Sequence, residues 1–117
     1  MKIVVFGLSI SSSWGNGHAT LWRGLVRALA ARGHEVVFFE RDAPCYASHR
    51  DLSGDLPGLD LIIYRDWAEA LPLCRAHLAD ADVGLVTSYC ADGVAATAEL
   101  LSSRARRRVF YDLDSPI

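Results

Sequence analysis

The residues of this sequence best suited to binding a ligand form one short stretch, SSSWGNGHA, which begins at Ser11. It follows the apolar segment KIVVF and precedes a segment with helical spacing of apolar residues. Free N–H groups at the start of a helix favour an anion, glycine allows close backbone approach, and serine hydroxyls donate hydrogen bonds. The stretch therefore predicts an anion site with the candidate residues Ser11, Ser12, Ser13, Gly15, Asn16, Gly17 and His18.

Other interpretations of this loop stay open. It is either a ligand site or a plain strand-to-helix connection with Asn16 or His18 as the cap, and its length favours the ligand site. Trp14 either covers the site or packs on its own domain. No GKS or GKT follows, and the glycines match GxGxxG poorly. Glu40, about 20 positions further on, keeps an NAD- or FAD-binding domain as an alternative, because an acidic residue there holds a ribose.

Further polar candidates follow the later apolar segments. Arg41 and Asp42 come after HEVVFFE, where they either bind acceptor hydroxyls or form an exposed ion pair. Ser88 and Tyr89 belong to a second strand-to-helix turn, and Asp92 is expected to cap the helix that follows. These residue types bind hydroxyl-rich ligands, and they recur at places where strands are expected to end.

Two carboxylates close the last apolar segment. Asp112 is a candidate ligand-binding residue, and Asp112 and Asp114 are both candidates for a base or for a contact with a neighbouring domain. The sequence shows no Ser-His-Asp elbow, no metal-ligand cluster and no close pair of carboxylates. It therefore predicts no metal site, and it leaves the catalytic residue open.

Five apolar segments that alternate with helical patterns must position these residues. The segments are IVVFGL, HEVVFFE, LDLIIY, ADVGLVTSY and RRVFYD. Continuous apolar runs are typical of parallel strands covered on both faces. The alternation predicts one α/β domain over residues 1–117, with a Rossmann-like, doubly wound parallel sheet of about five strands in the order 3-2-1-4-5 and helices on both faces. Ligands bind such sheets at the carboxyl ends of the strands, where the strand order reverses.

Helical spacing also predicts which side chains face the sheet. Gly33 is expected to end the first long helix in a left-handed conformation. Pro72 is placed in the first turn of the next helix, because a proline further along would interrupt it. The predicted inward residues, in chain order, are Leu21, Leu25, Val26 and Leu29; Leu71, Cys74 and Leu78; and Val94, Ala98 and Leu101.

Composition excludes several classes of protein. A chain of 117 residues with 51% hydrophobic and 22% charged residues forms one domain with a core. A net charge of -2 argues against nucleic-acid binding, and the basic segment RARRR is interpreted as a solvated helix end. Three cysteines without CxxC spacing favour a reducing compartment. No segment approaches the ~20 apolar residues of a membrane span, so a cytoplasmic protein is expected.

The combination of these segments resembles a known family. Residues 7–52, GLSISSSWGNGHATLWRGLVRALAARGHEVVFFERDAPCYASHRDL, are similar to the amino-terminal domain of CgeB-like proteins of the spore maturation type. These are predicted glycosyltransferases of the two-domain GT-B type, related to the family-4 transferases. ADVGLVTSYCADG and FYDLDSPI resemble the next blocks of the family, so the resemblance covers nearly the whole chain.

The resemblance implies a function. In this type of enzyme the amino-terminal domain shapes the acceptor side, and the glycine-rich loop lies against the donor phosphates. The expected substrates are a nucleotide sugar and an acceptor, with no separate cofactor. The family continues with a donor-binding carboxyl-terminal domain, so the chain is expected to be an inactive half with uncovered apolar surface and self-association. A non-catalytic interaction domain remains the other alternative.

Overall fold

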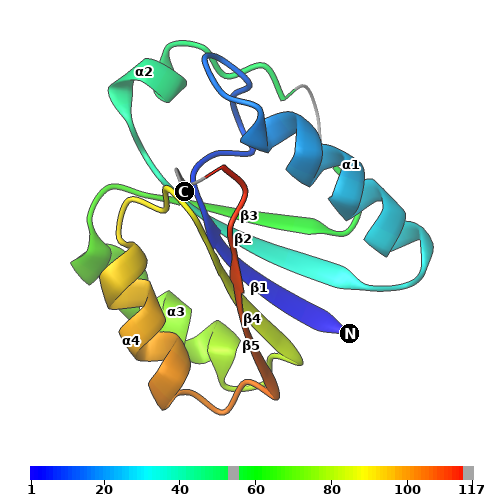
Figure 1. The fold of residues 1–117 in the computed structure, drawn as a ribbon, viewed down its shortest axis with the longest axis vertical. Coiled ribbons are helices and arrows are strands. Elements are labelled where there is room, and N and C mark those ends of the chain that lie inside the picture. Colours follow the sequence, from blue (N-terminus) through cyan, green and yellow to red (C-terminus); the bar gives the residue numbers. More distant parts are fainter. Residues whose placement is uncertain (53–55, 115–117) are drawn as a thin grey trace.

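A five-stranded, all-parallel sheet forms the centre of the computed structural model, which describes residues 1–52 and 56–114 (Figure 1). The strand order β3-β2-β1-β4-β5 confirms the predicted topology and the α/β class. The strands are β1 (Lys2–Gly7), β2 (Glu35–Arg41), β3 (Leu59–Tyr64), β4 (Val83–Thr87) and β5 (Arg107–Tyr111). The helices are α1 (His18–Ala31), α2 (Pro44–Ala47), α3 (Trp67–Leu78) and α4 (Gly93–Ser102).

Strand β1 lies at the centre of the sheet. Strands β2 and β3 are added on one side of it and β4 and β5 on the other, which creates the predicted reversal of strand order. Val4 of β1 is paired with Val37 of β2 on one side and with Gly84 of β4 on the other. Helix α1 covers one face of the sheet, and α3 and α4 cover the opposite face (Figure 1). The carboxyl ends of β1 and β4 therefore lie at the place where ligands bind in such sheets.

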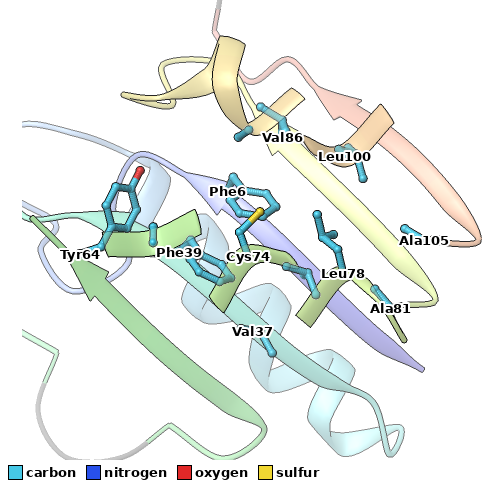
Figure 2. Close-up of a cluster of buried hydrophobic side chains, with 13 residues drawn as sticks. Phe6, Val37, Phe39, Tyr64, Cys74, Leu78, Ala81, Val86, Leu100 and Ala105 are labelled. Carbon is cyan, nitrogen blue, oxygen red and sulfur yellow. The ribbon is translucent and has the colours of Figure 1, made fainter. Parts of the chain in front are cut away.

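The core on the α3 and α4 face is close-packed (Figure 2). The rings of Phe6 and Phe39 stack with centroids 4.8 Å apart, and Cys74 and Leu78 of α3 lie in the same cluster. Gly84 is required here, because a Cβ at this position would lie 2.2 Å from the Cδ1 atom of Leu100. The close approach of α4 to β4 therefore depends on a glycine in the strand.

Helix α1 is rotated relative to the prediction. Leu21 and Leu25 are 37% and 36% exposed, so their assignment to the inward face is wrong. The sheet-facing residues include Trp22, whose ring lies 5.6 Å from that of Phe38, and Val26, which was predicted correctly. Burial of the Trp22 indole, which is larger than a leucine side chain, contributes more free energy than the partial exposure of the two leucines costs. Trp22 therefore sets the rotation of the helix.

Helix α4 also presents another face to the sheet. Val94 is 90% and Leu101 64% exposed, and Ala98 is exposed, so the predicted inward stripe is wrong. Ala96 and Leu100 face the core instead. This helix is apolar on most sides, so its spacing left the inward face ambiguous, and the space above Gly84 selects Leu100.

Helix α3 runs through its proline. Asp66 caps it by accepting a hydrogen bond of 2.9 Å from the Glu69 N–H, so Pro72 lies inside the helix and its predicted place in the first turn is wrong. Pro72 is exposed, and the burial of Ala70, Cys74 and Leu78 offsets the hydrogen bond that the proline cannot make. Gly33 ends α1 with a φ of 82°, as predicted. In the described residues no helix is both long and apolar enough to span a membrane.

Candidate functional site

The candidate site lies at the carboxyl edge of the sheet, where three connections meet. They are the β1–α1 loop, the β4–α4 turn and the segment after β5. His18, at the start of α1, hydrogen-bonds Asp114 after β5, which in turn contacts Ser88 after β4. The topology therefore brings together residues that are 96 positions apart in the chain.

Glu40 holds the first half of the β1–α1 loop from the inside. Its side chain is fully buried, and Oε1 accepts hydrogen bonds from the N–H groups of Ile10, at 2.7 Å, and Ser11, at 3.0 Å. The Ser11 hydroxyl donates to Oε2 at 2.5 Å and accepts a bond from Arg50 Nε at 3.1 Å. The buried carboxylate is thus compensated by donors of the loop, and it is not accessible to a ribose.

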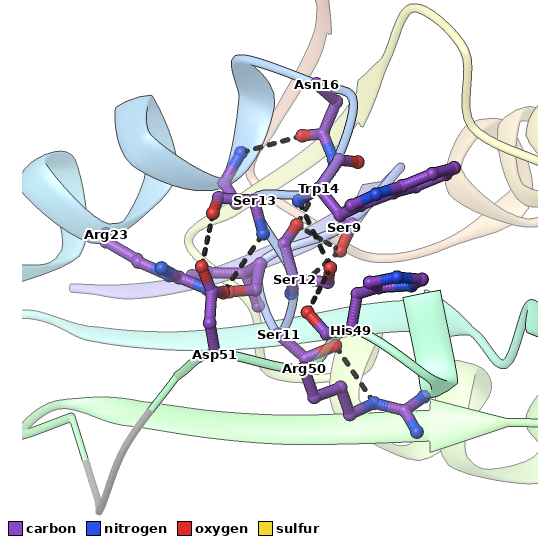
Figure 3. Close-up of polar contacts among 12 residues, drawn as sticks. Ser9, Ser11, Ser12, Ser13, Trp14, Asn16, Arg23, His49, Arg50 and Asp51 are labelled. Atoms are coloured by element: carbon purple, nitrogen blue, oxygen red, sulfur yellow. Dashed lines mark hydrogen bonds and ion pairs between the residues drawn. The ribbon is translucent and has the colours of Figure 1, made fainter. Parts of the chain in front are cut away.

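Asp51 holds the second half of the loop from the outside (Figure 3). It accepts bonds from the N–H and the hydroxyl of Ser13, and from Arg23 at 2.7 Å. These hydrogen bonds, with the Ser13 hydroxyl first, lower the pKa of Asp51 far below its usual range. Sequence analysis did not single out Asp51, because the carboxylate is 38 positions from Ser13 and only the tertiary fold brings the two together.

The open part of the loop is its glycine segment. Ser12 bonds Ser9 and the His49 carbonyl, so all three serines are engaged within the chain. In the described part of the chain, no hydrogen bond reaches the N–H groups of Gly15, Gly17 or His18. A Cβ at Gly17, where φ is −93°, would meet no atom within 4 Å. Packing thus gives no reason for this glycine, and an external anion would meet Gly15 to His18 rather than the serines.

Asn16 orders the start of α1. Its Oδ1 accepts a bond of 3.2 Å from the Ala19 N–H, and its Nδ2 donates to the carbonyls of Ser12 and Trp14 at 3.1 Å. Asn16 thus satisfies one of the first N–H groups of α1, although the residue at the cap position itself is Gly17. With Ala19 capped, the N–H groups that remain open at this helix end are concentrated beside the two glycines.

His18 is the titratable side chain at the centre of the site. It is 4% exposed, and its Nε2 lies 3.3 Å from both carboxylate oxygens of Asp114. Its Nδ1 is buried and has no hydrogen-bond partner among the described residues. Ser88 helps to place the carboxylate, because its Oγ accepts from the Leu113 N–H at 3.0 Å and lies 3.5 Å from Asp114.

Tyr89 borders His18 on the solvent side. It is 56% exposed, and its ring stands edge-on to the imidazole with centroids 6.1 Å apart. Its φ of 60° is rare for a residue with a Cβ, and such strain is concentrated at ligand sites. Ser88, Tyr89 and the first turn of α4 line an open hollow together with Phe110.

Arg41 and Asp42 form ion pairs with partners other than each other. Arg41 binds Asp92 at 3.1 Å, and Asp42 binds Arg50 at 2.8 Å. Asp92 occupies the predicted cap position of α4, but its side chain makes no cap hydrogen bond, because Arg41 and the Tyr64 hydroxyl engage its carboxylate. Burial, and then the bond to Asp92, raise the pKa of Tyr64 strongly. These contacts connect the ends of β2, β3 and β4.

The remaining predicted residue, Asp112, is exposed at the end of β5. Within residues 1–52 and 56–114, no group of three or more His, Cys, Asp or Glu side chains is arranged to hold a metal ion. No family model, curated protein or solved structure matches this chain. The function is therefore inferred from the geometry of the site.

Proposed function

We propose that this chain is the acceptor-side domain of a GT-B glycosyltransferase, which transfers a sugar from a nucleotide sugar to an acceptor hydroxyl. The observation that carries the proposal is the pair of His18 and Asp114, placed beside the open N–H groups of Gly15 and Gly17 at the reversal of strand order. A base and an anion site next to each other are what transfer from a sugar diphosphate needs.

In such a transfer, the acceptor oxygen bonds the anomeric carbon while the bond from that carbon to the diphosphate breaks. The acceptor hydroxyl must lose its proton, and histidine is the commonest side chain for this role. Because Nδ1 is buried, the proton would pass to the pair at its Nε2–carboxylate side, which is open to solvent through Asp114. The Asp114 carboxylate then stabilises the imidazolium. The leaving diphosphate is expected at the N–H groups of Gly15 to His18.

The structure bears differently on the two alternatives, a dinucleotide-binding domain and a non-catalytic interaction domain. A dinucleotide-binding domain depends on Glu40, and the buried carboxylate binds its own loop instead of a ribose. A non-catalytic interaction domain is favoured by the exposed apolar side chains of Val94, Leu101 and Phe110. Three free cysteines accord with a cytoplasmic location, which is part of the proposal.

Amide NMR of the chain with UDP-, GDP- and dTDP-sugars tests the proposal. At least one donor is expected to shift the amide signals of Gly15, Gly17 and His18. Gly17→Gln should weaken this binding about tenfold, because the longer side chain fills the open space, while its negative φ leaves the fold intact. Gly24→Gln is the matched control, since Gly24 is an exposed glycine in α1 with equally open surroundings.

A second measurement concerns the base. Where transfer is measured with the full-length enzyme, His18→Gln and Asp114→Asn should reduce kcat by about 10²-fold or more and leave donor binding unchanged. Failure of every nucleotide sugar to shift the glycine amides would overturn the proposed donor site. Full activity of His18→Gln would overturn the role of the base.

A further inference from the structure

Trp14 has a large apolar side chain that is exposed to solvent. It is 51% exposed at the tip of the β1–α1 loop, whereas Trp22 is 1% exposed and Trp67 packs against the core. An exposed indole forgoes the stabilisation that its burial would contribute. Its position therefore calls for an explanation outside the packing of this domain.

A ring contact holds the exposed indole, and two hydrogen bonds hold the backbone of Trp14. The indole stacks on the imidazole of His49 with centroids 4.7 Å apart and an angle of 18° between the planes. The Trp14 N–H donates to Ser12 Oγ at 3.2 Å, and its carbonyl accepts from Asn16 Nδ2 at 3.1 Å. The indole is thus a pre-organised surface, and a ligand that binds it loses little free energy in ordering it.

His49 is fixed by the same network. Its carbonyl accepts a bond of 2.7 Å from Ser12 Oγ, and its Nδ1 lies 2.8 Å from the carbonyl of Cys45. The Ser12 hydroxyl therefore connects the two stacked residues. Figure 3 shows that both rings project in the same direction, away from Arg23 and Asp51.

We infer that Trp14 is a stacking platform for the pyranose ring of a carbohydrate acceptor. Because His49 covers one face of the indole, the opposite face remains available for a flat ligand. The C–H bonds on one face of a pyranose ring carry partial positive charge and pack against the negative face of an aromatic ring. The nearby carboxylate of Asp51 is already paired with Ser13 and Arg23, so the platform suits an uncharged ring.

The carbohydrate site at Trp14 does not depend on the proposed function; only the assignment of its ligand as the acceptor does. Trp14 and His18 belong to the same connection, four positions apart, with the open glycines between them. An acceptor ring on Trp14 and a donor diphosphate at Gly17 would thus occupy adjacent parts of one loop. The inference adds the class of acceptor, a glycoside, to a reaction that otherwise specifies only a hydroxyl.

NMR of the indole N–H signals tests this inference without any transfer reaction. The probes are methyl β-glucoside, maltotriose, cellotriose and chitotriose, with uridine and UMP as non-sugar rings. At least one saccharide is expected to shift the Trp14 signal and leave those of the buried Trp22 and the partly buried Trp67 unchanged. Trp14→Ala should weaken this binding about tenfold, as measured by saturation transfer, and Trp14→Phe should weaken it less.

Two further variants sharpen the result. His49→Ala should weaken saccharide binding severalfold, because the indole loses the ring that supports it. Phe110→Ala should leave binding unchanged, since Phe110 is another exposed aromatic residue, on the edge strand β5. Wild-type binding by His49→Ala would overturn the role of the stack, and weakening by Phe110→Ala would overturn the placement of the site.

The inference and the proposed function fail separately. If no saccharide at millimolar concentration shifts the Trp14 signal, or if only uridine and UMP do so, the carbohydrate platform is overturned whatever the glycine amides show. If saccharides bind at Trp14 and no nucleotide sugar reaches Gly17, the platform is supported as a carbohydrate site, and the donor site is the part that is overturned.

Discussion

The carboxylate of Glu40 accepts hydrogen bonds from both the N–H and the hydroxyl of Ser11, in a place with no exposed surface. The serine half of the loop thus contains an anion that belongs to the chain itself. Backbone N–H groups in such loops can bind a phosphate. Here the N–H groups of Ile10 and Ser11 bind the Glu40 carboxylate instead, which fixes the loop to the end of β2. The contact leaves the glycine half of the loop free for a ligand.

Removal of the Glu40 carboxylate should destabilise the domain. Glu40→Ala leaves the N–H groups of Ile10 and Ser11 buried without an acceptor, at an expected cost of about 3 kcal/mol. Glu40→Gln keeps one acceptor oxygen and should cost about 1–2 kcal/mol. Urea unfolding at neutral pH measures both. Glu35→Gln, an exposed glutamate on the same strand, is the control, and an equal effect there would contradict the prediction.

The stability of the domain should depend on Asp51 below about pH 4. The pKa of Asp51 is lower in the folded chain than in the unfolded chain, first because of the Ser13 hydroxyl and then because of Arg23. Its contribution is therefore present above the unfolded pKa of about 4 and is lost as the pH falls below it.

Asp51→Asn should accordingly lower the melting temperature at about pH 6, and the difference from the wild type should shrink as the pH falls towards about 3. The exposed side chain of Asp60 makes no hydrogen bond with the described residues, so Asp60→Asn is the control. A difference for Asp51→Asn that stays constant with pH would contradict the proposed linkage.

The three cysteines should react at different rates. Cys45 is exposed, whereas burial raises the pKa of Cys74 to about 12 and that of Cys90 to about 11. Since the thiolate is the reactive form, a thiol reagent at about pH 8 should modify Cys45 rapidly, the partly buried Cys90 slowly and the buried Cys74 only after unfolding. Cys45→Ser should abolish the fast phase. A rapid second equivalent in the native wild type would contradict this order.

The exposed apolar side chains of Val94, Leu101 and Phe110 should cause self-association. These side chains are 90%, 64% and 64% exposed, and their burial between two copies would be favourable. Sedimentation of the wild type should show mass action towards dimers. Leu101→Lys should shift it to the monomer, whereas Leu73→Lys, at another exposed leucine, should not. A wild type that stays monomeric at high concentration would count against the prediction.

The main elements could be predicted from the sequence because each depends on local patterns. Continuous apolar runs placed β1, β2 and β3 close to their observed bounds, and their alternation with helices predicted the strand order. The helix rotations could not be predicted equally well. Leu21 and Leu101 fit a helical stripe, but Trp22 and the space above Gly84 select other faces. Such a choice depends on the volume of residues in other elements.

The candidate site shows the same division. The sequence by itself determined that a Ser- and Gly-rich loop precedes α1 and that acidic residues follow the strands, because these are properties of neighbouring residues. Only the tertiary structure decided that Glu40 and Asp51 bind the serines, and that Asp114 lies beside His18. A hydrogen bond requires two atoms to lie about 3 Å apart, and for residues far apart in the chain that distance is set by the packing of the sheet and helices between them.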